Sequence, residues 1–147
     1  MEKLELPTMY ELCLMHARAD RAMRSVVGGQ LESHKLTMME WLSMGVVASG
    51  PKDGISMTQI AATLDVTMPQ VTALIGNLME QKMIKQHVLA SDRRGRQVIV
   101  TSRGKRSLAK LETEIAKVMR QWTQDIDRDQ LKSYIQSVAI LAGKVNK

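Results

Sequence analysis

The chain has 147 residues, 44% of them hydrophobic, and a formal net charge of +6. This length and apolar content allow one packed domain, with or without an oligomerisation appendage, and exclude a disordered chain. No apolar run approaches the roughly 20 residues of a membrane span, and the first residues lack the pattern of a signal peptide. We therefore expect a cytoplasmic protein with no membrane partner. The single cysteine, Cys13, excludes an internal disulfide, and the dispersed histidines predict no metal and no cofactor.

Helix starts are marked by a recurring cap pattern. A Ser or Thr followed three positions later by Glu or Gln satisfies two orphan backbone amides reciprocally, and Asp can replace the hydroxyl residue. The pairs are Thr8 with Glu11, Thr37 with Glu40, Ser56 with Gln59, Thr67 with Gln70 and Asp127 with Gln130. Together with apolar periodicity, these starts predict helices over residues 8–27, 37–48, 56–64, 67–81 and 128–142.

The connections between these helices follow from turn residues. Gly28 and Gly29 weaken helix formation after residue 27, and residues 50–54 form a loop. The helices over 56–64 and 67–81 are separated by two residues, with Asp65 suited to a left-handed turn and Ala61 small enough for the helix crossing. This arrangement predicts a helix-turn-helix.

After Met83 the apolar period changes. Residues 84–89 and 97–101 are β-prone and enclose the basic segment 91–96, which predicts a hairpin with a cationic tip. A long amphipathic helix then extends to about residue 125. The last helix is expected to bury five apolar residues: Leu131, Tyr134, Ile135, Val138 and Leu141.

The predicted fold class is therefore mainly α with a small β-hairpin wing. Long amphipathic helices at both chain ends need a partner surface, which favours a homodimer over packing within one subunit. The expected organisation is a winged helix-turn-helix at 36–101, flanked by dimerisation helices at 1–35 and 102–147.

The net positive charge is concentrated in one stretch. Residues 82–106 contain eight basic residues against Asp92 alone, a charge of +7, so the rest of the chain sums to −1. A cationic block inside a folded chain indicates a polyanionic partner, and double-stranded DNA is the partner that a helix-turn-helix followed by a hairpin fits. The alternative for the charge alone is a solvated basic face.

The DNA-contacting residues expected from this arrangement lie on two elements. The helix over 67–81 presents its exposed first turns to the major groove, with Thr67, Met68, Gln70, Thr72 and Ala73, and the amides at Ser56 and Thr67 suit phosphates. The wing carries Arg93, Arg94 and Arg96, which suit a minor groove. The helix over 67–81 has no Lys or Arg, so it cannot recognise guanine through an arginine. We therefore expect weaker base discrimination, or discrimination that tolerates A·T pairs.

Five segments together resemble the multiple-antibiotic-resistance regulator (MarR) family. They are residues 36–42 (LTMMEWL), 60–67 (IAATLDVT), 71–78 (VTALIGNL), 92–94 (DRR) and 100–104 (VTSRG). The resemblance covers nearly the whole chain and implies that Asp92 and Arg94 shape the wing and engage DNA. It also implies a homodimer that binds a pseudo-palindromic operator and represses nearby genes. Ala73, Gly76 and Lys82 depart from the common pattern, so the operator sequence does not transfer.

The resemblance further implies control by a small aromatic acid or by an oxidant. Candidate ligand-binding residues are His16, Arg18 and Trp41, for an aromatic or apolar ligand. Cys13 lies where peroxide sensors of the family keep their reactive cysteine, but its apolar neighbours favour a buried structural residue. A different class of function is a winged-helix protein-interaction module. No nucleophile with a base, phosphate loop or carboxylate pair has useful spacing, so we do not expect an enzyme.

Overall fold

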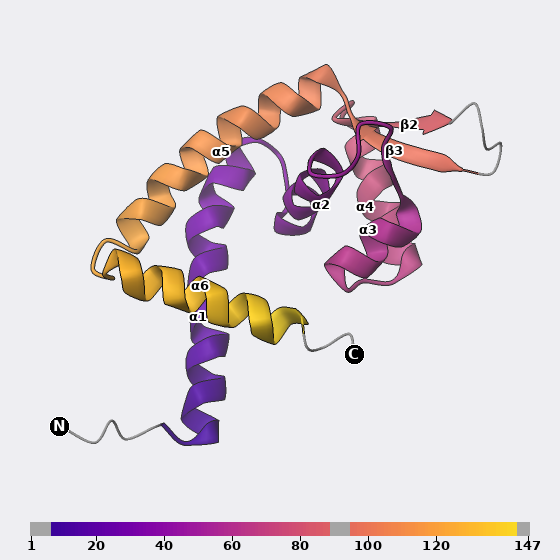
Figure 1. Cartoon of the computed structure of the whole chain (residues 1–147). Helices are drawn as coiled ribbons and strands as arrows, with labels where there is room; N and C mark the ends of the chain where they lie inside the picture. The colour runs from indigo at the N-terminus through magenta and orange to yellow at the C-terminus, as the bar shows by residue number, and fades with distance from the viewer. Residues whose placement is uncertain (1–6, 89–94, 144–147) are drawn as a thin grey trace.

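The structure, a computed structural model, describes residues 7–88 and 95–143. Within these ranges the elements follow the predicted order of helices and hairpin, with one short strand added (Figure 1). They are α1 (Met9–Ser33), α2 (Met38–Ala48), β1 (Ile55–Ser56), α3 (Met57–Leu64), α4 (Met68–Glu80), β2 (Ile84–Val88), β3 (Arg96–Val100), α5 (Ser102–Trp122) and α6 (Arg128–Gly143). The predicted fold class, mainly α with a small β wing, is confirmed.

All five predicted caps are present. Reciprocal capping boxes start α1, α2, α3 and α4. Before α6, the Asp127 carboxylate accepts from the Gln130 backbone N–H at 3.4 Å, and the Gln130 side-chain oxygen accepts from the Asp127 N–H at 3.3 Å. Each cap stabilises its helix by about 1 kcal/mol, and together they explain why the helix starts could be located from the sequence.

Helix α1 does not end where the sequence predicted. It continues through Gly28 and Gly29 to Ser33, six residues beyond the expected end. Two interior glycines cost a helix roughly 1 kcal/mol each. Burial of Val27 and Leu31, which are 3% and 2% exposed, offsets that cost by joining the extended helix to the core. Tertiary packing therefore overrides the local glycine signal.

The sheet has three strands in the order β1-β3-β2, all antiparallel. Strand β1 was not expected, because it has only two residues, which directly follow a loop, and the second of them, Ser56, is the cap of α3. Ile55 pairs with Val98, and Gly54 before it has φ +102. A Cβ at Gly54 would lie 2.9 Å from the Val98 carbonyl oxygen, so only glycine lets the loop approach β3 this closely.

The hydrophobic core lies where α2, α3 and α4 meet the inner face of the sheet. The second half of α1 and the middle of α5 add residues to it, so the core joins every element except α6. Its fully buried side chains include Met44, Ile60, Val71, Leu78, Val98 and Leu111. None of the described helices is long and apolar enough to cross a membrane.

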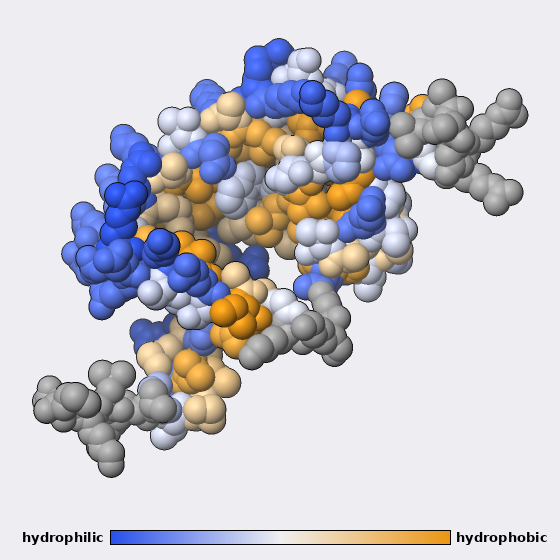
Figure 2. Space-filling view, in the orientation of Figure 1, coloured by the Kyte–Doolittle hydropathy of each residue, from blue (hydrophilic) through white to orange (hydrophobic). Residues whose placement is uncertain are grey.

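Two burial expectations are wrong for the single chain. Helix α6 has no buried residue, and Tyr134, Ile135 and Leu141 are each more than half exposed. Cys13, expected to be buried, is exposed on the first half of α1. The reason is the same in both places: these helix faces extend beyond the core, and no other segment among residues 7–88 and 95–143 covers them (Figures 1 and 2).

Candidate nucleic-acid interface

Helices α3 and α4 form the predicted helix-turn-helix. Asp65 ends α3 in the left-handed conformation, with φ 54 and ψ 45, and the Val66 N–H donates to the Ala61 carbonyl at 3.1 Å. Ala61 and Val71 are buried where the two helices cross. The tight turn thus fixes the direction in which α4 leaves α3, as the sequence indicated.

The amino-terminal half of α4 is open to solvent. Val71, Ile75 and Leu78 form its buried face, whereas the predicted groove-facing residues all lie on the exposed side. Those residues are Thr67, Met68, Gln70, Thr72 and Ala73. A helix held by one face, with its first turns exposed, has the geometry that entry into a major groove requires.

Two of the predicted base-reading side chains already have partners. The Gln70 side-chain oxygen accepts from the Thr67 N–H at 2.9 Å and from the Thr67 hydroxyl at 3.0 Å. The Thr72 hydroxyl donates to the Met68 carbonyl at 2.9 Å. Bidentate recognition of adenine needs both the oxygen and the nitrogen of Gln70. Reading a base in this way would therefore require opening the cap of α4.

The wing is formed by β2 and β3. Their register runs from Ile84 opposite Val100 at the base to Val88 opposite Arg96 at the outer end. Arg96 and Lys85 are exposed, whereas Val98 faces the core. The other predicted wing residues, Asp92, Arg93 and Arg94, lie outside the described residues.

The base of the wing is tied to the start of α5. The Thr101 hydroxyl donates to the Lys82 carbonyl at 2.6 Å and accepts from the Gly104 N–H at 3.0 Å. A Cβ at Gly104 would collide with the Met83 carbonyl oxygen. Lys82 itself has φ 59, the left-handed conformation that glycine usually supplies. The segment 100–104 is therefore a structural joint that places α5 directly beside the wing.

The basic residues of segment 82–106 are consequently divided between the wing and α5. Of the described members, Lys82, Lys85 and Arg96 lie on or beside the wing. Arg103, Lys105 and Arg106 are exposed on the first turns of α5. Figure 2 shows hydrophilic residues gathered over this start of α5 and the base of the wing. The predicted hairpin therefore carries only part of the positive charge of residues 82–106, and the joint at Gly104 places the rest, at the start of α5, beside it.

A contact that sequence analysis missed links α2 to α4. Glu40, only 6% exposed, accepts from the Thr37 N–H at 2.9 Å with one oxygen and from the Asn77 amide at 3.3 Å with the other. The capping box predicted the first bond. The second joins residues 37 positions apart, for which the sequence contains no signal. It fixes the second half of α4 against the start of α2.

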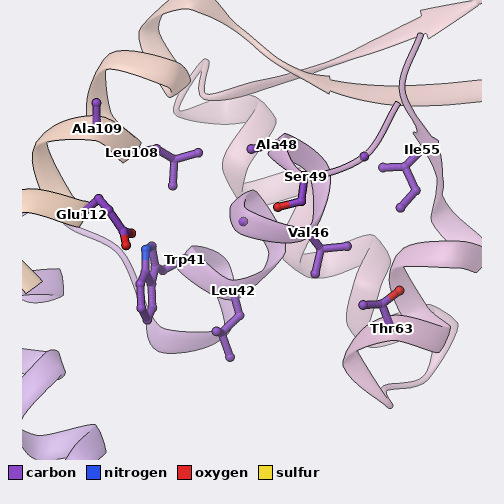
Figure 3. A pocket seen from close by; sticks show the side chains of 12 residues that line it. Trp41, Leu42, Val46, Ala48, Ser49, Ile55, Thr63, Leu108, Ala109 and Glu112 are labelled. Carbon is purple, nitrogen blue, oxygen red and sulfur yellow. The ribbon is translucent and has the colours of Figure 1, made fainter. Parts of the chain in front are cut away.

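The three candidate ligand residues are not brought together in one chain. Trp41 is half-buried on α2 and lines a cavity of about 800 Å³ between α2 and α5 (Figure 3). His16 and Arg18 are exposed on the first half of α1 and are not among the residues that line it. The cavity's carboxylate, Glu112 on α5, was not predicted, because only the packing of α5 against α2 places it there.

By its geometry this is a winged helix-turn-helix, and comparisons with known proteins agree. No protein-family model matches the chain. Among solved structures it is similar to AbsC, a MarR family transcriptional regulator from Streptomyces coelicolor, with a TM-score of 0.80 and 17% identity, covering 96% of this chain and 97% of that one. It is also similar to the transcriptional regulator SlyA (TM-score 0.79, 19% identity, 91% and 93% covered). A third is MepR of S. aureus in a complex with DNA (TM-score 0.74, 19% identity, 95% and 98% covered). The chain thus has the MarR-type winged-helix fold, as the sequence resemblance implied.

Proposed function

We propose that this chain is a sequence-specific regulator of transcription that binds double-stranded DNA. One observation carries the proposal. The amino-terminal half of α4 is exposed, and the basic residues of segment 82–106 lie on the wing and on the first turns of α5. The solved DNA complex of a structurally similar protein supports it. In this arrangement α4 enters the major groove, and Arg93, Arg94 and Arg96 of the wing, shaped by Asp92, reach the adjacent minor groove.

We further propose that the working form is a homodimer on a pseudo-palindromic site. In this organisation residues 36–101 read DNA, and residues 1–35 and 102–147 dimerise. The support is the pair of uncovered apolar faces, one on the first half of α1 and one on α6 together with Ile126 in the turn before it. Their exposed residues are Met9, Tyr10, Leu12, Leu14, Met15, Ile126, Tyr134, Ile135, Ile140 and Leu141. Apolar faces of this extent are typical of protein interfaces.

The DNA-binding proposal can be tested in two steps. Bound fragments are first selected from random duplex DNA, and the affinity for the selected duplex is then measured at several salt concentrations. If about six phosphates are neutralised per subunit, log K falls with log salt at a slope near −5 per subunit. Arg96→Ala should reduce that slope by about one per subunit and weaken all sequences alike. Lys117→Ala, an equal charge change at an exposed position in the second half of α5, serves as the matched control.

Two outcomes would contradict the proposal. A flat salt response would remove the phosphate contacts on which it depends. A chain without affinity for any duplex would favour the alternative of a protein-interaction module whose basic wing meets an acidic partner.

Within this function we propose that the chain acts as a repressor that a small ligand releases from DNA. The support is the cavity between α2 and α5, because its walls belong both to the helix-turn-helix unit and to a helix that leads into the proposed dimer interface. An occupant of this cavity can bias how the two parts are held relative to each other. Transcription from a promoter containing the selected site, with and without the protein, distinguishes repression from activation.

A further inference from the structure

Over residues 68–76, the face of α4 opposite its buried side is narrow and apolar. Along its centre, at helical spacing, lie Pro69, Ala73 and Gly76. Met68, which is 44% exposed, borders them in the first turn. Pro, Ala and Gly have no polar side-chain group, and the thioether of Met is at most a weak acceptor. Small residues at the centre let the helix approach base edges closely, and the contacts that this face can make there are apolar.

The polar side chains that flank this face already have partners within the chain. The Gln70 oxygen accepts two bonds within the α4 cap, and the Thr72 hydroxyl donates to the Met68 carbonyl. The Asn77 amide nitrogen donates to Glu40 of α2. Donation from the Gln70 nitrogen alone fits an acceptor on guanine, adenine or thymine, so it distinguishes these bases poorly. Hydrogen bonds from α4 therefore offer little base discrimination while its cap is closed.

The thymine methyl group is the base feature that suits such a face. Thymine is the one base of ordinary DNA that presents an apolar group, its C5-methyl, in the major groove. Met68 suits contact with it, because the methionine side chain is flexible and polarizable and adapts to irregular apolar surfaces. In 5-methylcytosine the same methyl group stands on the same ring carbon, whereas the hydrogen-bonding groups of the two bases differ. A face that recognises the methyl group alone does not distinguish thymine from 5-methylcytosine.

We propose that α4 distinguishes bases by their C5-methyl groups, with Met68 as the main contact, and that it therefore accepts 5-methylcytosine in place of thymine. The inference rests on the proposed DNA-binding function and names the chemical group that this site recognises. Binding then responds to cytosine methylation. Wherever the base that faces Met68 is cytosine, methylation of that base tightens binding of the protein.

Changes of single chemical groups in the selected duplex test the proposal. Each thymine is replaced in turn by deoxyuridine, which removes the methyl group and leaves the hydrogen-bonding groups intact. At the thymine that Met68 contacts, the loss should be about fourfold in affinity, the factor for one buried apolar carbon. A C·G pair at this position should bind at least as weakly as the uracil pair, and 5-methylcytosine paired with guanine should restore most of the loss. Replacing adenines by 7-deazaadenine, which removes the N7 acceptor, should leave the affinity unchanged.

Three variants assign the effect to a side chain. Met68→Ala should bind the thymine and uracil duplexes equally. Its matched control, Met79→Ala, makes the same truncation near the other end of α4, where Met79 is 37% exposed, and should keep the preference for thymine. Gln70→Glu keeps the cap, because Glu fills the same position in the capping boxes of α1 and α2, but it removes the amide donor. It should weaken binding to all duplexes alike, since it adds a negative charge, and leave the preference for thymine over uracil unchanged.

The outcomes separate this inference from the proposed function. Equal affinity for the thymine and uracil duplexes at every position overturns methyl recognition while DNA binding stands. So does a loss on 7-deazaadenine substitution that Gln70→Glu abolishes, because adenine is then read through Gln70. A preference for thymine that Met68→Ala and Met79→Ala reduce equally overturns the role of Met68. A C·G pair that methylation does not improve overturns the response to 5-methylcytosine. A chain that binds no duplex contradicts the DNA-binding proposal, and this inference with it.

Discussion

The helix-turn-helix unit and the last helix of this chain, α6, differ in how they bury their apolar residues. Each of α2, α3 and α4 contributes a side chain with essentially no exposure, such as Met44, Ile60 and Leu78. Helix α6 contributes none, although it carries as many large apolar residues as α4. The helix-turn-helix unit thus lies at the centre of the core, whereas α6 has an apolar face that no other described residue covers, as the proposed dimer requires.

Truncation of one leucine in each region should show this difference most strongly. Leu78→Ala removes a side chain with 0% exposure from α4 and should lower the free energy of unfolding by about 2–5 kcal/mol. Leu141→Ala removes the same atoms from α6, where 53% of the residue is exposed. In dilute protein it should change the free energy by less than about 0.5 kcal/mol.

Urea denaturation at two protein concentrations measures both effects. If α6 lies in a dimer interface, the cost of Leu141→Ala grows as concentration rises and the dimer forms, while the cost of Leu78→Ala does not. Equal costs for the two variants in dilute protein would show that α6 has a partner within its own chain, and the contrast would be lost.

Two helical glycines allow a smaller but sharper test of the same contrast. At Gly104, in the joint between wing and α5, an added Cβ meets the Met83 carbonyl oxygen and the Val100 side chain. We expect Gly104→Ala to destabilise the protein by about 1–3 kcal/mol, since the joint must shift. At Gly28 in α1 an added Cβ meets nothing within 4 Å. Gly28→Ala should therefore stabilise the helix by up to about 1 kcal/mol.

Thermal unfolding of the two variants gives opposite signs if this account is correct. A stabilising Gly104→Ala would show that the start of α5 is not packed against the base of the wing. A destabilising Gly28→Ala would show that this face of α1 is closely covered in the working form of the protein.

Most of the fold could be predicted because its signals are local. Capping residues located the helix starts, and Asp65 indicated the turn between α3 and α4. What the sequence missed depends on contacts between distant residues. Burial of Leu31 extends α1 beyond its glycines, and packing of α5 against α2 places Glu112 in the cavity.

The candidate site divides in the same way. Periodicity correctly separated the buried face of α4 from its exposed face. The sequence predicted two roles for the Gln70 side chain, capping α4 and reading a base. It did not show that the two roles compete, because the same side-chain oxygen already accepts from the Thr67 N–H. A local pattern indicates what a side chain can do, and the structure shows which of its atoms are already bound.

The smallest predicted effect concerns a contact that needs no core at all. In the capping box of α1, the Thr8 backbone N–H and then the Thr8 hydroxyl donate to the Glu11 carboxylate and lower its pKa below the ordinary value of 4.5. A lowered pKa in the folded state means that the ionised carboxylate stabilises the first turn above the unfolded pKa. This contribution disappears as pH falls through the folded pKa.

Carboxyl NMR titration of Glu11 should therefore give a pKa below 4.5, and Thr8→Ala, which removes the hydroxyl donor, should raise it. Backbone chemical shifts of the first turn of α1 should move toward random-coil values over the same acidic range, with the shifts of α4 unchanged. An unshifted Glu11 pKa with Thr8 intact would contradict the cap. Because this stabilisation comes from hydrogen bonds within four residues, it should persist whether or not a partner covers the apolar face of α1, unlike the contribution of Leu141.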